Sequence, residues 1–185
     1  MLIRFDHAGL VKGYELGSAP FGRDASLHYL RLEDVRGTAL DHLIAVKGKL
    51  PPARAVSLTM DIAQALRHLE REGFVHGDLR AEHVVVDARN RGRILDAGVA
   101  QPLAPGGRDP RIAEDIFALG TLLRAMLTGS LDDLDKGATD LGSVRVSASL
   151  LTVIRSMLHP DPSRRFQHWG DLVVVLQTAV EPGGV

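Results

Sequence analysis

The stretch His76-Gly77-Asp78-Leu79-Arg80-Ala81-Glu82-His83-Val84-Val85-Val86-Asp87 decides the fold that this sequence predicts. It places the carboxylate of Asp78 in a loop, shortly before an apolar run at residues 84–86 that predicts a strand. Residues 93–95 form a second short run, and the polar residues 87–92 between the two are typical of a hairpin turn. Because this hairpin leads into Asp96, the sequence predicts two acidic side chains close to one site.

Upstream of this loop, the pattern predicts two strands and two helices. Residues 10–16 and 27–32 read as strands, and residues 17–24 between them predict a turn. A Gly37-Thr38 break leads into a short helix, and Pro51-Pro52 opens a longer helix that ends at Glu72-Gly73. The apolar face of the longer helix is made of Leu58, Ile62, Ala65, Leu66 and Leu69.

Downstream of the hairpin, the sequence is mainly helical. Residues 102–110 are rich in proline and glycine, and three helices are expected after them, at residues 115–127, 149–158 and 169–180. A little β structure followed by mostly α structure predicts an α+β fold.

Length and composition limit the class of protein. A chain of 185 residues is long enough for one domain, which buries about 70% of its unfolded surface, and two full domains are not expected. With 45% hydrophobic residues, 24% charged residues and a net charge of −1, no electrostatic feature favours nucleic acid or an anionic membrane as partner. The chain has no cysteine and no stretch of about 20 apolar residues, so we expect a cytoplasmic protein without disulfides or membrane spans.

Several motifs, in the same order along the chain, resemble those of the protein kinases. The stretch from His76 to His83 resembles the H-R-D-L-x-x-x-N catalytic loop, with Gly77 at the Arg position and His83 at the Asn position. Asp96-Ala97-Gly98 resembles the metal-binding D-F-G motif. The other similar segments are residues 27–37 (last N-lobe strand and hinge), residues 51–73 (the helix before the catalytic loop), Asp115-Ile116-Phe117-Ala118-Leu119-Gly120 (the central C-lobe helix) and Asp161-Pro162-Ser163-Arg164-Arg165-Phe166 (the D-P-x-x-R-F turn).

The resemblance implies a fold and a division of the chain. The expected fold is α+β and is that of a protein-kinase-like C-lobe, predominantly helical, with a remnant N-lobe strand pair and a small catalytic-loop hairpin. Residues 1–36 are expected to form the remnant N-lobe strands and hinge. Residues 37–185 are expected to form the helical C-lobe as a single compact unit.

The resemblance also implies the site residues and the cofactors, ATP with magnesium or manganese. Asp78 takes the place of the catalytic base, with Arg80 beside it as a cation that meets phosphate. Asp96 and His83 take the two metal-binding positions. The nucleotide base is expected to rest against Leu32, Glu33, Val35 and Val85.

Departures from the family pattern weaken the implied ATP chemistry. The chain contains no Gly-rich phosphate loop, no V-A-I-K lysine and no helix glutamate to pair with that lysine. Loss of one preorganised donor typically costs about 100- to 1,000-fold in rate, so little or no turnover is expected. Magnesium prefers oxygen ligands, so His83 at a metal position predicts weaker magnesium binding and a better fit to manganese or zinc.

Further departures concern the segment between Gly98 and Asp115. It has no A-P-E motif and no hydroxyl side chain to phosphorylate, and Ala97 stands at the Phe position of D-F-G, where we expect it to face an empty space. Arg165 pairs with the A-P-E glutamate in the family; here its expected partner is Glu114, or it is a plain surface arginine.

Other groups are expected to be structural. His76 and Asp115 match family residues that tie the catalytic loop to the central helix. Arg89, Arg91 and Arg93 lie near the hairpin turn and are expected to form a solvated face, with a partner site as the alternative.

Two functional readings follow. The first is a truncated, pseudokinase-like domain that acts as a regulatory or binding module, with a protein partner that supplies N-lobe elements; an exposed strand edge makes self-association the other expected interaction. The second is a serine/threonine protein kinase, completed by a separate N-lobe, in which Asp78 is the base and Asp96 the metal ligand. Small-molecule phosphotransfer is a variant of the second reading.

Overall fold

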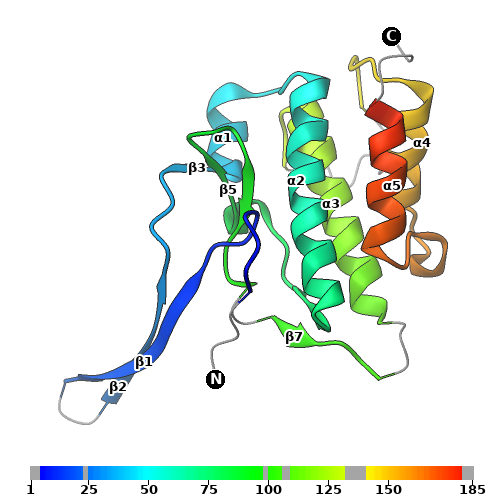
Figure 1. Ribbon diagram of the computed structural model, residues 1–185. Helices are drawn as coiled ribbons and strands as arrows, with labels where there is room; N and C mark the ends of the chain where they lie inside the picture. Colours follow the sequence, from blue (N-terminus) through cyan, green and yellow to red (C-terminus); the bar gives the residue numbers. More distant parts are fainter. Residues whose placement is uncertain (1–4, 23–24, 98–99, 106–108, 132–140, 181–185) are drawn as a thin grey trace.

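The computed structural model describes residues 5–22, 25–97, 100–105, 109–131 and 141–180. Its architecture is α+β, with a body of long helices and three small antiparallel sheets (Figure 1). Helix α2 packs against α3 and α5, and α4 packs against the same two helices. The helices are α1 (Leu40–Lys47), α2 (Pro52–Arg71), α3 (Pro110–Thr128), α4 (Ala148–Met157) and α5 (Trp169–Val180).

The boundaries of the long helices follow from their capping residues. Pro occupies the first helical position of α2, as the sequence predicts, and the predicted apolar face of this helix is almost completely buried. Helix α3 begins at Pro110, whereas the sequence indicated Asp115. The side chain of Asp109 accepts a hydrogen bond from the main-chain N–H of Arg111, which caps the helix there. Gly129, with a φ of 78°, ends α3 in the left-handed conformation.

The sheet next to the catalytic-loop sequence has the strand order β3-β5-β6. Strands β5 (Val84–Asp87) and β6 (Gly92–Ile94) form the predicted hairpin, and β3 (Gly37–Ala39) pairs with the other edge of β5. Asp96, which follows β6, has a positive φ of 60°, a conformation that Asp tolerates better than most residues. The hairpin therefore directs the chain into Asp96 close to the end of the Asp78 loop.

A second, very short sheet joins the start of the loop to the segment after it. Strand β4 (Phe74–Val75) pairs antiparallel with β7 (Gln101–Pro102). Residues His76 to Asp78 follow β4 directly, so a contact that fixes β7 also fixes the start of this loop.

Strands β1 (Gly13–Phe21) and β2 (Ala25–Leu32) form a two-stranded hairpin that projects away from the helices (Figure 1). The expected turn at residues 17–24 is wrong for residues 17–21, which belong to β1, and residues 23–24 lie outside the described part of the chain. Strand β1 also starts at Gly13 rather than at Leu10. Gly17 and Pro20 suggested a turn, but a strand at the edge of an exposed hairpin accepts both residue types.

The N-terminal segment lies against the end of α2. Phe5 makes an edge-to-face contact with Phe74, and the rings of His7 and His68 stack at 5.1 Å. Leu10 is fully buried and bridges to Ile94 of β6. Among the described residues, no helix combines the length and the apolar character needed to cross a bilayer.

Candidate functional site

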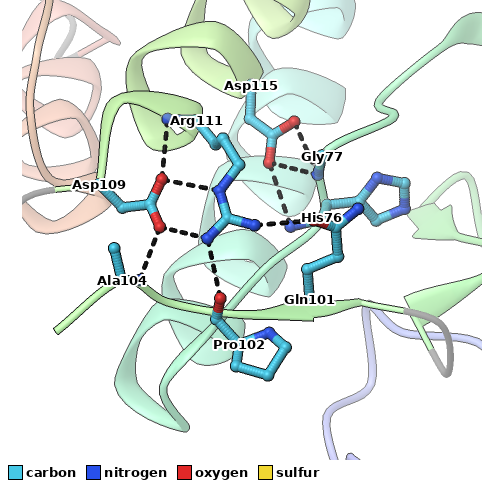
Figure 2. Close-up of polar contacts among 8 residues, drawn as sticks. All are labelled: His76, Gly77, Gln101, Pro102, Ala104, Asp109, Arg111 and Asp115. Atoms are coloured by element: carbon cyan, nitrogen blue, oxygen red, sulfur yellow. Dashed lines mark hydrogen bonds and ion pairs between the residues drawn. The ribbon is translucent and has the colours of Figure 1, made fainter.

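The start of the catalytic-loop sequence is fixed to α3 by one buried carboxylate. Asp115 accepts main-chain N–H hydrogen bonds from His76 (3.1 Å) and Gly77 (3.0 Å), as Figure 2 shows. Burial raises the pKa of Asp115, and the two main-chain donors oppose that shift. Gly77 has a φ of 77°, a conformation in which glycine is unstrained. His76 and Asp115 thus have the tying contacts that the sequence predicted.

The ring of His76 fixes the next part of the loop. Its Nδ1 accepts the N–H of Asp78 (3.3 Å), so the proton of the neutral ring is on Nε2, which donates to the carbonyl oxygen of Leu95 (3.1 Å). This one side chain therefore links the Asp78 loop to the end of the β5–β6 hairpin.

A second network holds the segment between Asp96 and Asp115, and Figure 2 shows it beside the first. Arg111 donates to both carboxylate oxygens of Asp109, to Oε1 of Gln101 (2.8 Å) and to the carbonyl oxygen of Pro102 (2.8 Å). Asp109 also accepts the N–H of Ala104 (2.8 Å). Strand β7 is therefore fastened to the first turn of α3, and through β4 it supports the Asp78 loop.

The electrostatics of this network favour its charged form. The hydrogen-bonded Arg111 guanidinium holds the pKa of Asp109 well below its usual range, against the opposing effect of burial. The same contact raises the pKa of Arg111. The sequence motifs missed both residues, although Asp-Pro before an apolar periodic run is a helix-start signal that identifies Asp109 as a cap.

The imidazole of His83 lies between the carboxylates of Asp78 and Asp96. Its Nδ1 donates to the carbonyl oxygen of Asp78 (2.7 Å) and lies 3.6 Å from the Asp78 carboxylate. Its Nε2 lies 4.0 Å from Oδ2 of Asp96. Because Nδ1 carries the proton of the neutral ring, the lone pair of Nε2 is available on the side of Asp96. The structure thus brings together three of the residues that the sequence named.

These residues fit a divalent cation only in part. The gap of 4.0 Å between Nε2 of His83 and Oδ2 of Asp96 leaves room for an ion bonded to each at about 2.1 Å. One nitrogen and one carboxylate form a mixed ligand set, which suits manganese or zinc better than magnesium. Within the described parts of the chain, no group of three or more His, Cys, Asp and Glu side chains is arranged to hold a metal. Any ion here needs further ligands from phosphate or water.

Arg80, the predicted phosphate contact, pairs with Glu82 rather than with Asp78. Its Nε lies 2.8 Å from a carboxylate oxygen of Glu82, and both side chains are more than half exposed. An exposed pair of this kind is weak, so Arg80 stays available to an anion.

The predicted nucleotide contacts do not line one hollow. Glu33 and Val35 line a hollow of about 460 Å³ with residues of the β5–β6 turn, and its described lining does not include Leu32 or Val85. Both carboxylate oxygens of Glu33 are engaged by Arg93, at 2.7 and 2.9 Å. The hydrogen bonds from Arg93 lower the pKa of Glu33. The Glu33 carboxylate therefore links the expected hinge segment to Arg93 of β6.

Three other expectations need correction. The arginines near the hairpin turn are not simply a solvated face, because the side chain of Arg93 is only 13% exposed and Arg91 forms an ion pair with Asp61. Ala97 does not face an empty space, since it is buried in the core. Arg165 donates to main-chain carbonyl oxygens of His159, Ala113 and Pro160, and stacks over Phe117; Glu114 adds only a longer-range attraction.

The chain is similar in sequence to known proteins of one family. The family model described as protein tyrosine and serine/threonine kinase matches residues 1–111. The chain is 25% identical over 146 residues to the serine/threonine-protein kinase PknB of Mycobacterium leprae, which covers 67% of this chain and 23% of that protein. It is 23% identical over 212 residues to the serine/threonine-protein kinase PrkC of Bacillus subtilis, covering 95% of this chain and 32% of that protein. The match to PknD of Mycobacterium tuberculosis, also a serine/threonine-protein kinase, is 26% identical and covers 86% of this chain and 30% of that protein. The chain thus spans about a quarter to a third of the length of these relatives.

Proposed function

The chain belongs to the protein tyrosine and serine/threonine kinase family, and from that premise we propose that it is a kinase-like binding and regulatory module with impaired magnesium-dependent phosphoryl transfer. The observation that carries the proposal is the position of His83 between Asp78 and Asp96. The family motif has an Asn at the position of His83, and that Asn supplies an oxygen ligand to a magnesium ion.

The impairment follows from ligand chemistry. A divalent cation neutralises charge that develops on the transferring phosphoryl group, and the family's residues serve mainly to position and stabilise that group. In this chain Nδ1 of His83 is occupied by the Asp78 carbonyl, so the ring offers a cation only the Nε2 nitrogen. Magnesium demands near-ideal octahedral geometry and prefers oxygen ligands. We therefore expect a site that takes manganese or zinc in preference to magnesium.

A catalytic base must be accessible to the substrate hydroxyl. The Asp78 carboxylate meets this requirement, because its side chain is 66% exposed. Its main chain is held by His76, and through His76 and Gly77 the loop is held by Asp115. This ordered loop favours a second candidate function, a serine/threonine protein kinase in which Asp78 accepts the hydroxyl proton and Asp96 binds the cation of ATP. In the first function His83 weakens the binding of magnesium, whereas in the second Asp96 binds the cation of ATP despite the presence of His83.

We further propose that the module works through a protein partner. The β1–β2 hairpin supports this proposal, because it extends away from the body and carries exposed apolar side chains. A regulatory module of this kind exerts its effect by binding, so catalysis by Asp78 is not required.

The experiment that tests the proposal is phosphate transfer from γ-labelled ATP to serine- and threonine-containing peptides. The wild-type chain and the variants His83→Asn and Asp78→Asn are compared in magnesium and in manganese. We expect no transfer by the wild type in magnesium and a measurable but small transfer by His83→Asn, which restores one oxygen ligand while the phosphate loop and its lysine are still missing from the sequence. The Asp78→Asn change, added to His83→Asn, abolishes that transfer. Transfer by the wild type in magnesium at the level of His83→Asn contradicts the proposal and favours the kinase.

A further inference from the structure

The hollow of about 460 Å³ beside the β5–β6 turn has four arginines in its lining. Arg36 comes from the expected hinge segment, Arg89 and Arg91 from the turn, and Arg93 from β6. An arginine stays charged and presents five N–H donors, so each guanidinium needs acceptors from the chain, from water or from a ligand. The donors that the chain leaves open indicate which ligand the hollow fits.

Two of the four arginines are held by carboxylates of the chain. Arg93 is only 13% exposed and donates to both carboxylate oxygens of Glu33. Arg91 contacts the nearly buried carboxylate of Asp61 through Nε and Nη2, and Asp61 also accepts the N–H of Gly92 (3.1 Å). The side chain of Arg91 is nevertheless 60% exposed, and within the described residues its Nη1 has no acceptor. Asp61 thus orients the Arg91 guanidinium and leaves donors for an anion.

The other two arginines, Arg36 and Arg89, have open side chains. Both residues are exposed, and neither side chain forms an ion pair or a hydrogen bond with any described residue. Their main chains are fixed, because the N–H of Ala88 donates to the carbonyl oxygen of Arg36 (3.1 Å) and the N–H of Arg89 donates to Asp87 (2.8 Å). The fold therefore places two unpaired guanidinium groups next to each other from distant parts of the chain.

The carboxylates at the hollow do not satisfy these open donors. The lining contains three carboxylates, those of Glu33, Asp34 and Asp87, against four arginines. Glu33 is bound to Arg93, and Asp87 accepts the main-chain N–H groups of Arg89 and Arg91. Asp34 is exposed and, among the described residues, makes no side-chain contact. The hollow thus has an excess of one positive charge, in a chain whose net charge is −1.

A second hollow, of about 420 Å³, adjoins the first at Arg91, which lines both. It lies between α2 and α5, and its lining includes the apolar side chains of Val56 and Met60, with Gln177 from α5. A ligand that crosses the exposed side of Arg91 therefore meets cations first and apolar surface next. A single phosphate or carboxylate is too small to contact both hollows, whereas an extended peptide presents successive side chains to each.

We propose that the two hollows form one docking groove for an extended acidic segment of a partner protein. Carboxylates of that segment bind Arg36, Arg89 and the open donors of Arg91, and an apolar side chain next to the acidic run occupies the hollow beside Met60. This inference rests on the proposed function in one respect, since it names the chemistry of the module's protein partner.

The composition of the groove favours a peptide over other polyanions. None of the described residues that line the two hollows is aromatic, so the groove offers no surface on which nucleic-acid bases stack. The guanidinium groups lie in a hollow beside carboxylates, and anionic lipid headgroups are bound instead by clusters of uncompensated cations on an exposed surface. An acidic peptide supplies both the carboxylates and the apolar side chain that the groove fits.

The test is the fluorescence anisotropy of a labelled peptide that contains a run of glutamates followed by leucines, titrated with the purified chain. The double variant Arg36→Ala/Arg89→Ala should bind this peptide about fivefold more weakly than the wild type, the loss typical of one or two exposed ion pairs. Because neither side chain has a partner inside the described protein, the double variant should keep the melting temperature of the wild type. Asp34→Asn removes the open carboxylate and should tighten binding by about twofold.

The matched control is the double variant Arg71→Ala/Arg155→Ala, which loses the same charge. Both arginines are exposed; Arg71 is the last residue of α2, and Arg155 lies on α4, across the helical body from β5 (Figure 1). This variant should bind the peptide as the wild type does. Equal losses in the two double variants overturn the proposal, because they show attraction by net charge alone.

The peptide is varied as well as the protein. Lysines in place of the glutamates should abolish binding, and serines in place of the leucines should weaken it by about threefold or more, because the apolar contact is lost. A serine peptide that binds as tightly as the leucine peptide overturns the joint groove. Oligothymidylate or phosphatidylserine vesicles that bind more tightly than the peptide, with the same dependence on Arg36 and Arg89, also overturn the proposal.

Failure of this inference can be told apart from failure of the proposed function, because peptide binding is measured without nucleotide or metal ion. A chain that binds no acidic peptide and transfers no phosphate in magnesium overturns only the docking groove. A chain that binds the peptide, and whose magnesium-dependent transfer equals that of His83→Asn, overturns only the impaired catalysis.

Discussion

The two ends of the Asp78 loop differ in how much of their chemistry is satisfied inside the protein. At the anchoring end, which we define as His76, Gly77, Asp115, Asp109 and Arg111, the two carboxylates accept main-chain hydrogen bonds and Asp109 is also paired with Arg111. At the cation end, defined as Asp78, His83 and Asp96, the carboxylates are 66% and 38% exposed and the histidine lies between them.

This difference shows that a loop can keep its shape while its reactive groups change. The anchoring contacts use side-chain carboxylates and main-chain N–H groups, none of which requires a bound nucleotide. In the proposed function, the cation end is complete only when an ion and further ligands are present. Substitutions at the anchoring end should therefore change stability, and substitutions at the cation end should change cation binding.

The largest expected effect is that of Asp115→Ala. Removal of this carboxylate leaves the N–H of the buried His76 without an acceptor and also removes the acceptor of the Gly77 N–H, which should cost about 3 kcal/mol of unfolding free energy. Urea denaturation measures the loss. The neighbouring Glu114→Ala is the control, since Glu114 is exposed and its removal should cost less than about 0.5 kcal/mol. Equal losses in the two variants would show that Asp115 is not an anchor.

The next effect is that of Asp109→Ala, which removes the cap of α3 and the partner of Arg111. We expect a loss of about 2 kcal/mol in the same denaturation experiment. Asp109→Asn keeps a capping oxygen and loses the charge, so it should fall between the wild type and Asp109→Ala.

The loss caused by Asp109→Asn should also depend on pH. Because the folded protein lowers the pKa of Asp109 from its ordinary 3.8, the unfolded chain binds the proton first as the pH falls. The stabilisation is present above about pH 3.8 and is lost as the pH falls below that value toward the folded pKa. A difference between wild type and Asp109→Asn that stays constant down to pH 2 would contradict this assignment.

A smaller effect is expected at the cation end. His83→Ala removes one hydrogen bond, from Nδ1 to the Asp78 carbonyl, and should cost about 1 kcal/mol in urea denaturation. If His83→Ala lowers the unfolding free energy as much as Asp115→Ala does, the cation end contributes as much to stability as the anchoring end, and the comparison between them is wrong.

The smallest effect concerns the N-terminal segment. Burial, and then the neighbouring His68, lower the pKa of His7 from its ordinary 6.5, so the unfolded chain takes up the proton more readily. Stability should therefore be highest above pH 6.5 and decrease as the pH falls through that value. His7→Gln should reduce this decrease between pH 7.5 and 5.5, measured by thermal unfolding. If His7→Gln loses as much stability as the wild type over this pH range, groups other than His7 cause the loss.

Much of the fold could be predicted because its helices are amphipathic. The apolar spacing of α2 and α5 gave their positions to within a residue or two, and the β5–β6 hairpin followed from two short apolar runs around a polar turn. The start of α3 was missed because Asp109 and Pro110 lie in a segment that reads as a Pro- and Gly-rich loop. The extent of β1 was missed because local turn residues lie in an exposed strand.

The sequence predicted only those site residues that the order of the family motifs identifies. The order of the motifs named Asp78, His83 and Asp96, and the structure places them near one another. The Arg111 network was missed because it depends on the pairing of β4 with β7, two dipeptides about 26 residues apart with no pattern of their own. The side-chain partner of Arg93, Glu33, is 60 residues away and equally invisible in sequence.

The most direct test of the central claim is the thermal unfolding of the wild type and His83→Asn in magnesium chloride and in manganese chloride, each with and without ATP. If His83 sets the cation preference, manganese should raise the melting temperature of the wild type in a dose-dependent way while magnesium leaves it unchanged. His83→Asn should gain a response to magnesium. A wild type that responds to magnesium as strongly as His83→Asn would contradict the account.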